Sequence, residues 1–106
     1  MKPQPNMASI MKQAQRMQAE MARVQDELKD ERVEVSVGGG AVKVVMTGEL
    51  VVDSVIIDPA AADPDDVAML QDLITAAVNE AVRQAQDVAG RKMSAVTGGM
   101  GIPGLM

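Results

Sequence analysis

The 106-residue sequence contains no cysteine, no histidine and no Trp, Tyr or Phe. Without cysteine, neither a disulfide framework nor a thiolate metal site can form. The absence of histidine removes the commonest metal ligand and the commonest general base. Without aromatic rings, the chain cannot stack single-stranded bases or build an aromatic cage around a cation. We therefore predict a protein that is not an enzyme and that uses no metal and no cofactor.

Long apolar runs are also absent. The longest uncharged stretch, residues 93–106, is interrupted by glycines and a proline and cannot span a bilayer. The first residues are polar and do not form the apolar centre of a signal peptide. We expect one cytoplasmic domain over residues 1–106, with a flexible lead at 1–7, a glycine-rich flexible tail at 97–106, and no membrane or small-molecule partner.

Charge is distributed unevenly along the chain. The net charge of −5 argues against nucleic acid as a partner. However, residues 1–25 carry a balance of +3, residues 26–82 a balance of −10, and residues 83–106 a balance of +2. A field that is basic at both ends of the chain can steer a polyanion despite the acidic total.

The first regular pattern is a heptad. Apolar residues alternate at spacings of three and four, at Met7, Ile10, Ala14, Met17, Met21, Val24 and Leu28. This spacing is typical of a coiled-coil seam, and it predicts a helix from about Ala8 to Glu31, capped by Asn6 or Ser9. We place a dimer interface on this seam, at Ile10, Met17, Met21 and Val24.

Three strands are predicted after this helix. In Arg32–Val37 apolar and polar residues alternate, which indicates a half-buried strand, and three glycines then end it. A second strand is expected over Ala41–Thr47. Gly48 provides a hairpin turn because glycine tolerates a positive φ, and a third strand follows over Leu50–Ile57. Short turns between consecutive strands predict an antiparallel meander.

A second helix follows an acidic start. Asp63 is a good N-cap and Pro64 suits the first helical position, after which apolar residues recur at helical spacing. The helix is expected to reach Ala89 or, passing Gly90, about Val96. The predicted fold class is therefore α+β, a small three-stranded antiparallel sheet flanked by long N- and C-terminal helices in the order α-β-β-β-α.

The lengths of these elements predict a homodimer. The first helix would be about 35 Å long, whereas the sheet would measure about 23 Å by 14 Å. Part of the helix must therefore extend past the sheet. An apolar seam on a projecting helix favours pairing with a second copy of the chain.

Familiar enzyme and metal motifs do not fit the sequence. The glycine run of Gly38–Lys43 has the wrong spacing for a phosphate-binding loop and joins two strands. The serines have no histidine to activate them. Asp63, Asp65 and Asp66 lack the central glycine and distal glutamate of a calcium loop, so helix capping explains them better. The ten methionines fit adaptable core filling better than a copper site or a peptide groove.

Several segments, taken in order, resemble the YbaB/EbfC family of bacterial nucleoid-associated proteins. The runs that carry the resemblance are Ile10–Gln15, Met17-Gln18, Gly38–Gly40, Val42–Val44, Thr47-Gly48, Ile56–Pro59, Leu70–Ile74, Asn79, Ala81, Lys92-Met93, Gly98-Gly99 and Pro103-Gly104. Each motif is unspecific by itself, but their order and spacing cover nearly the whole chain from about Ala8 onward.

The resemblance implies a tweezers-shaped homodimer that binds double-stranded DNA in the nucleoid, organises the bacterial chromosome and regulates genes. In the family, the two terminal helices are held to contact DNA. The basic positions that this implies here are Lys12, Arg16 and Arg23 in the first helix, and Arg83, Arg91 and Lys92 in the second.

We therefore predict duplex binding by a homodimer, mainly through phosphates. With about three contacts from each protomer, log K should fall with log salt at a slope near −5. A rival hypothesis is a structural adaptor whose heptad helix pairs with a protein partner, which the acidic middle of the chain also suits.

Overall fold

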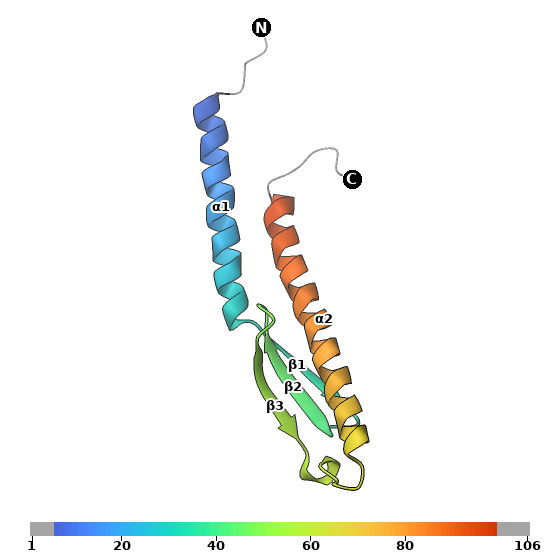
Figure 1. The fold of residues 1–106 in the computed structure, drawn as a ribbon. Coiled ribbons are helices and arrows are strands. Elements are labelled where there is room, and N and C mark those ends of the chain that lie inside the picture. Colours follow the sequence, from blue (N-terminus) through green and yellow to red (C-terminus); the bar gives the residue numbers. More distant parts are fainter. Residues whose placement is uncertain (1–5, 100–106) are drawn as a thin grey trace.

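The computed structural model describes residues 6–99 of the chain. In that range the elements are α1 (Met7–Asp30), β1 (Arg32–Val37), β2 (Val42–Thr47), β3 (Val52–Ile57), the short 3₁₀ helix η1 (Pro59–Ala61) and α2 (Val67–Gly99). The three strands form one antiparallel sheet in the order β1-β2-β3. This confirms the α+β class and the meander. Figure 1 shows α2 lying along the sheet, while α1 extends beyond it.

Helix α1 is capped by Asn6, one of the two caps that the sequence offered. The side-chain oxygen of Asn6 accepts a hydrogen bond from the backbone N–H of Ala8 at 3.0 Å. This bond satisfies one of the N–H groups that a helix start leaves without an intrahelical partner. Helix α1 therefore starts at Met7, and residues 6 and 7 of the predicted flexible lead are ordered by it.

Alternation along the strands places one face of the sheet in the core. Val33 and Val35 of β1 are buried, and they pair with Met46 and Val44 of β2. Residues opposite each other in an antiparallel pair point to the same face. The apolar set of both strands therefore faces α2, as the period of two in the sequence predicted.

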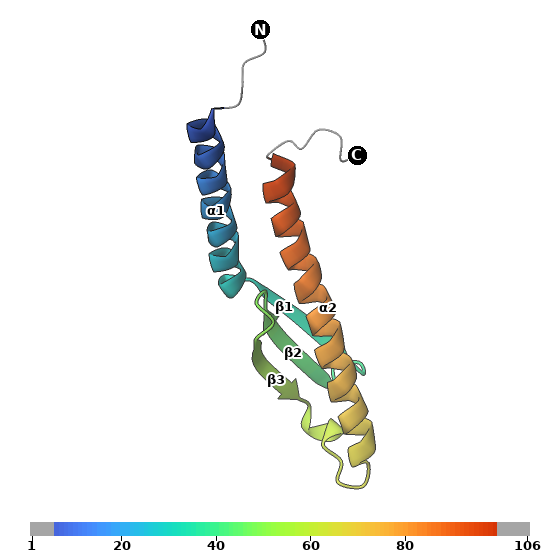
Figure 2. The same ribbon diagram turned by 45° about the horizontal axis from the view of Figure 1, so that its top comes forward.

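Helix α2 contacts this face through small side chains. Ala77, Ala81 and Ala85 recur every four residues and are 0% exposed. They pack in one cluster with the buried valines and Met46 of the sheet. Because alanine carries one methyl group, the helix axis can lie close to the sheet. Figure 2 shows the first half of α2 following the sheet and its second half passing beyond it.

Both ends of α2 differ from the prediction. The helix starts at Val67, and the cap is Asp66, whose side chain accepts from the N–H of Met69 at 3.2 Å. Asp63 instead accepts from the N–H of Asp65 in the preceding turn. At the other end the helix continues to Gly99, so residues 97–99 of the predicted tail are helical. The remainder of the predicted lead and tail, residues 1–5 and 100–106, lies outside the described residues.

The glycines of the two hairpins have different structural roles. Gly38, Gly39 and Gly40 all have positive φ, which confirms the glycine run as a turn between β1 and β2. The predicted hairpin turn at Gly48 is confirmed between β2 and β3, but the reason given for it was wrong, because the residue with positive φ is Leu50. Gly48 is required for a close approach, since a Cβ there would lie 2.8 Å from the carbonyl oxygen of Leu28.

This approach attaches α1 to the sheet. The N–H of Gly48 donates to the carbonyl oxygens of Leu28 at 3.0 Å and Glu31 at 3.2 Å. The β2–β3 turn thus satisfies carbonyl groups that the end of a helix leaves unpaired. Leu28 is itself buried, so the end of α1 is fixed both by hydrogen bonds and by packing.

The molecule is elongated. It measures 79 × 26 × 16 Å, and its radius of gyration is 20.9 Å, compared with about 13 Å for a compact domain of this size. The projecting parts are most of α1 and the second half of α2, which lie beside each other (Figures 1 and 2). No helix in the described part of the chain combines the length and apolar character needed to cross a membrane.

Candidate nucleic-acid interface

The outer half of α1 carries two cations, Lys12 and Arg16, that form no ion pair within the described residues. Lys12 and Arg16 are exposed and lie four residues apart, so they occupy the same face of the helix. Among residues 6–99, they are the cations that form no ion pair. Both side chains can therefore reach an external anion, although Glu20 lies one helical turn after Arg16. This pair is the strongest candidate for a phosphate-binding site.

Arg23 is held between two carboxylates of its own helix. Its Nη2 lies 2.6 Å from Glu20 Oε2, and its Nη1 lies 2.6 Å from Glu27 Oε1. The hydrogen bond that Arg23 donates to Glu20 is the main reason that the pKa of Arg23 is raised, and Glu27 adds to it. We call these three residues the Arg23 bridge. The bridge partly neutralises a cation that the sequence placed in the DNA interface.

Lys92 joins the two projecting helices. Its Nζ lies 3.1 Å from Glu31 Oε1 and 3.4 Å from Glu27 Oε2, both on α1. The hydrogen bond to Glu31, followed by that to Glu27, raises the pKa of Lys92. This lysine, predicted to bind DNA, therefore holds α2 against α1.

The remaining predicted cations are paired within α2. Arg83 donates two hydrogen bonds to Glu80, which raises the pKa of the guanidinium and lowers the pKa of the carboxyl. Arg91 Nη2 lies 3.2 Å from Asp87 Oδ2. Both pairs are exposed and follow the spacing of helical neighbours, so each is a weak interaction.

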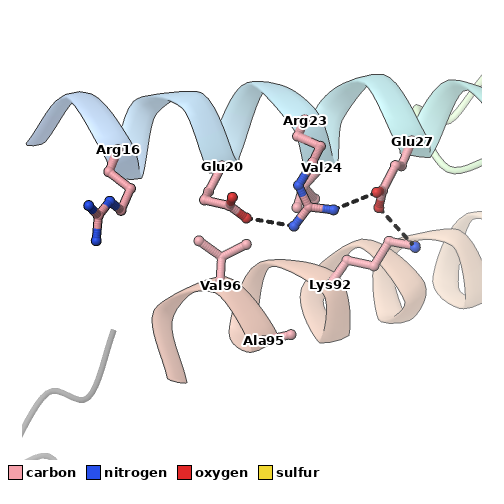
Figure 3. A pocket seen from close by; sticks show the side chains of 8 residues that line it. All are labelled: Arg16, Glu20, Arg23, Val24, Glu27, Lys92, Ala95 and Val96. Carbon is pink, nitrogen blue, oxygen red and sulfur yellow. Dashed lines mark hydrogen bonds and ion pairs between the residues drawn. The ribbon is translucent and has the colours of Figure 1, made fainter. Parts of the chain in front are cut away.

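A cleft of about 490 Å³ opens between the projecting parts of α1 and α2. It is lined by Arg16, Glu20, Arg23, Val24, Glu27, Lys92, Ala95 and Val96. Figure 3 shows a chain of alternating charges along it, from Glu20 through Arg23 and Glu27 to Lys92. Val96 and Ala95 of α2 provide its apolar side. The structure thus brings Arg16, Arg23 and Lys92 to one cleft, whereas Arg83 and Arg91 do not line it.

The predicted binding residues did not include the acidic partners of these cations. Glu20 and Glu27 stand three residues before and four residues after Arg23. That spacing places both carboxylates next to the guanidinium on any helix, so the sequence carried the signal. Glu31 is different, because its contact with Lys92 depends on how α1 and α2 pack.

The predicted dimer seam is divided between two environments. Val24 is 3% exposed in the single chain, so it packs within the protomer and is not a free interface residue. Ile10 is 47% and Met21 37% exposed, and Met17 is half-buried. Exposed apolar residues also occur along the edge strand β3 and the turn before it, at Val51, Val52, Val55 and Ile56. The seam of α1 and the edge of β3 are thus two places where a second copy can cover apolar side chains.

Comparison with known proteins gives a consistent result. The model of the YbaB/EbfC DNA-binding family matches residues 1–100. A nucleoid-associated protein of Acetivibrio thermocellus is 55% identical over 101 residues, which cover 94% of this chain and 89% of that protein. One from Ruminiclostridium cellulolyticum is 52% identical over 101 residues, covering 94% and 88%.

A solved structure has the same fold. The crystal structure of the uncharacterized protein HP0035 from Helicobacter pylori matches with a TM-score of 0.75 over 89% of this chain and 97% of that chain. The two sequences are 20% identical. The arrangement of two long helices around a three-stranded sheet is therefore retained at low sequence identity.

Proposed function

Because this chain belongs to the YbaB/EbfC DNA-binding family, we propose that it binds double-stranded DNA as a nucleoid-associated homodimer. Binding is mainly to phosphates and is made by the projecting helices. A dimer that presents two sets of helix ends can contact two segments of duplex. This mode of binding would organise the chromosome and alter the expression of genes near its sites.

The observation that carries the proposal is the pair of unpaired cations on α1. Lys12 and Arg16 are exposed on a helix that projects from the sheet, and neither forms an ion pair with a carboxylate of the described residues. Phosphate contacts release condensed counterions from DNA. With two such contacts from each protomer, a dimer should show a slope of log K against log salt of about −3.6. This is shallower than the slope near −5 expected when Arg23 also contributes.

A salt titration of binding to a duplex of mixed sequence tests the proposal. In the Lys12→Ala/Arg16→Ala variant, affinity should fall on all sequences alike and the slope should approach zero. The matched control is Lys29→Ala/Lys43→Ala, which removes the same charge from two lysines already paired with Asp26 and Glu34. If the wild type shows a slope near zero, or does not bind at about 50 mM salt, the proposal is wrong.

The dimer is proposed on the apolar seam of α1, where Ile10, Met17 and Met21 stay accessible. Sedimentation of Met17→Asp should show monomers that also lose DNA binding. Ile56→Asp provides the comparison, because Ile56 is 53% exposed on the edge strand β3. Should Ile56→Asp give monomers while Met17→Asp stays dimeric, the sheet edge is the interface.

The adaptor hypothesis gives a different result in the same measurements. It expects Met17→Asp to remain dimeric and to bind DNA as weakly as the wild type, because the seam would then serve a different protein. DNA binding that depends on Lys12 and Arg16 contradicts it.

A further inference from the structure

The Arg23 bridge places two carboxylates where DNA phosphates would bind. Both terminal nitrogens of the guanidinium are occupied at 2.6 Å by Glu20 and Glu27. A guanidinium recognises carboxylate and phosphate through the same planar set of N–H donors. The two ligands therefore compete for one group.

The competition takes place at a position that DNA can reach. The side chain of Arg23 is 55% exposed, and Arg16 lines the same cleft. Arg23 lies seven residues after Arg16, which is about two helical turns and leaves the two cations on related faces. A duplex bound at Lys12 and Arg16 would thus have phosphates near Arg23.

We infer that Glu20 and Glu27 act as intramolecular competitors of DNA phosphate, and that together they keep Arg23 out of the DNA interface of the wild type. Each exposed pair is weak by itself, but the two carboxylates occupy both terminal nitrogens of the guanidinium at the same time. The wild type then binds DNA with fewer contacts than its cations would allow. This inference rests on the proposed function, and it states that Glu20 and Glu27 limit the affinity for DNA.

Removal of the competitors should strengthen binding. In Glu20→Gln/Glu27→Gln, each protomer gains one phosphate contact, and the slope of log K against log salt should steepen from about −3.6 to about −5.4. For the same reason, the advantage of this variant over the wild type should shrink about tenfold between 50 and 200 mM salt. Changing Arg23 to Gln in the same variant should remove the gain.

The control separates local competition from general charge. Asp30→Asn/Glu49→Gln removes the same two negative charges from exposed carboxylates that form no ion pair within the described residues. It should leave the slope at the wild-type value. Glu20→Gln alone is the second variant, because it leaves the contact between Glu27 and Lys92 in place and so does not loosen α1.

The outcomes are distinguishable. A wild type that binds with a slope of about −3.6, together with equal slopes for the Glu20/Glu27 and Asp30/Glu49 variants, overturns the inference and leaves the proposed function intact. A wild type that fails to bind at about 50 mM salt overturns the proposed function itself. A steeper slope that persists after Arg23→Gln also contradicts the inference, because the new contact then comes from another residue.

Discussion

Single residues determine how α1 is attached, and Gly48 is the clearest example. Its missing side chain lets the β2–β3 turn approach the backbone of Leu28, and its N–H bonds to the carbonyl groups there. A methyl group at this position would meet a backbone atom, which cannot rotate away as a flexible side chain does. The requirement is steric, and it is not a requirement for positive φ.

Gly48→Ala should therefore lower the free energy of unfolding by about 1–3 kcal/mol, a typical cost of overpacking. Gly90→Ala is the matched control, since nothing lies within 4 Å of the Cβ it would add. It should raise the free energy of unfolding by about 0.5–1 kcal/mol, because alanine favours a helix interior. Chemical denaturation of both variants measures these changes, and equal effects of the two substitutions would refute the steric explanation.

A second residue, Lys92, makes the attachment of α2 to α1 depend on pH. Contacts with Glu31 and then Glu27 raise its pKa above the ordinary value of 10.5. The folded chain therefore holds this proton more tightly than the unfolded chain. The stabilisation is complete below the ordinary pKa and is lost as the pH rises through the raised pKa.

Urea unfolding of the wild type should thus show a loss of stability above about pH 10.5 that Lys92→Met lacks. Arg91→Met serves as the control, because it removes a neighbouring cation whose ion pair, with Asp87, lies within α2. The Arg91 variant should keep the pH dependence of the wild type. Parallel curves for the Lys92 variant and the wild type would show that the contacts with Glu31 and Glu27 do not stabilise the fold.

At the scale of whole elements, local patterns predicted most of the structure. The alternation in Arg32–Val37 gave the first strand with its observed ends, and Asn6 gave the start of α1. The start of α2 was placed too early because Asp63 and Asp66 are equally good caps. The structure uses Asp66 at the helix start and Asp63 in the turn before it. Its end was placed too early because glycine near the C-terminus is a common stop signal, although α2 continues past Gly90.

The candidate site, like the elements, was predictable from the sequence only where it depends on local patterns. The cations themselves were identified from charge and resemblance, and the pairing of Arg23 with Glu20 and Glu27 follows from helical spacing. The contact of Lys92 with Glu31 joins residues 61 positions apart. It depends on the packing between α1 and α2, for which no local pattern in the sequence gives the register.

The packing of α2 on the sheet depends on its alanines. Ala81→Leu should cost at least about 1–3 kcal/mol, because Ala81 is 0% exposed and the larger side chain must displace either the helix or the valines beneath it. Ala76→Leu, at an exposed position of the same helix, should be close to neutral. Thermal unfolding measures both. If Ala81→Leu leaves the thermal stability unchanged, the side chains on this face of the sheet can rearrange to accommodate the leucine.

On the scale of the whole molecule, charge is separated along the long axis. The unpaired cations Lys12 and Arg16 lie on the projecting part of α1, whereas Asp58, Asp63, Asp65 and Asp66 lie in the segment before α2, at the opposite end (Figure 1). A polyanion is therefore attracted to one end and repelled from the other. Screening over about 8–10 Å at physiological salt keeps the two ends independent.

Hydrogen exchange should record this polarity. On addition of duplex DNA, backbone amides around residues 10–20 should become protected, while those of residues 58–66 should exchange unchanged. The reason is that bound phosphate restricts the helix end that it contacts. Lys12→Ala/Arg16→Ala should abolish the protection. Protection confined to residues 58–66 would contradict this prediction, because the DNA would then be bound at the acidic end of the molecule.

The attachment at Gly48 also means that a tilt of α1 about its C-terminal end would move its other end by a larger distance. The helix is anchored near Val24 and Leu28, and Lys12 lies twelve residues away from Val24, which is about 18 Å along the axis. A tilt of about 20° at the anchor would thus swing Lys12 through about 6 Å. Such a displacement is larger than the reach of a hydrogen bond. In the proposed dimer, small changes in packing at the anchor would therefore set the distance between the cations of the two protomers, and with it the spacing of the phosphates that they bind.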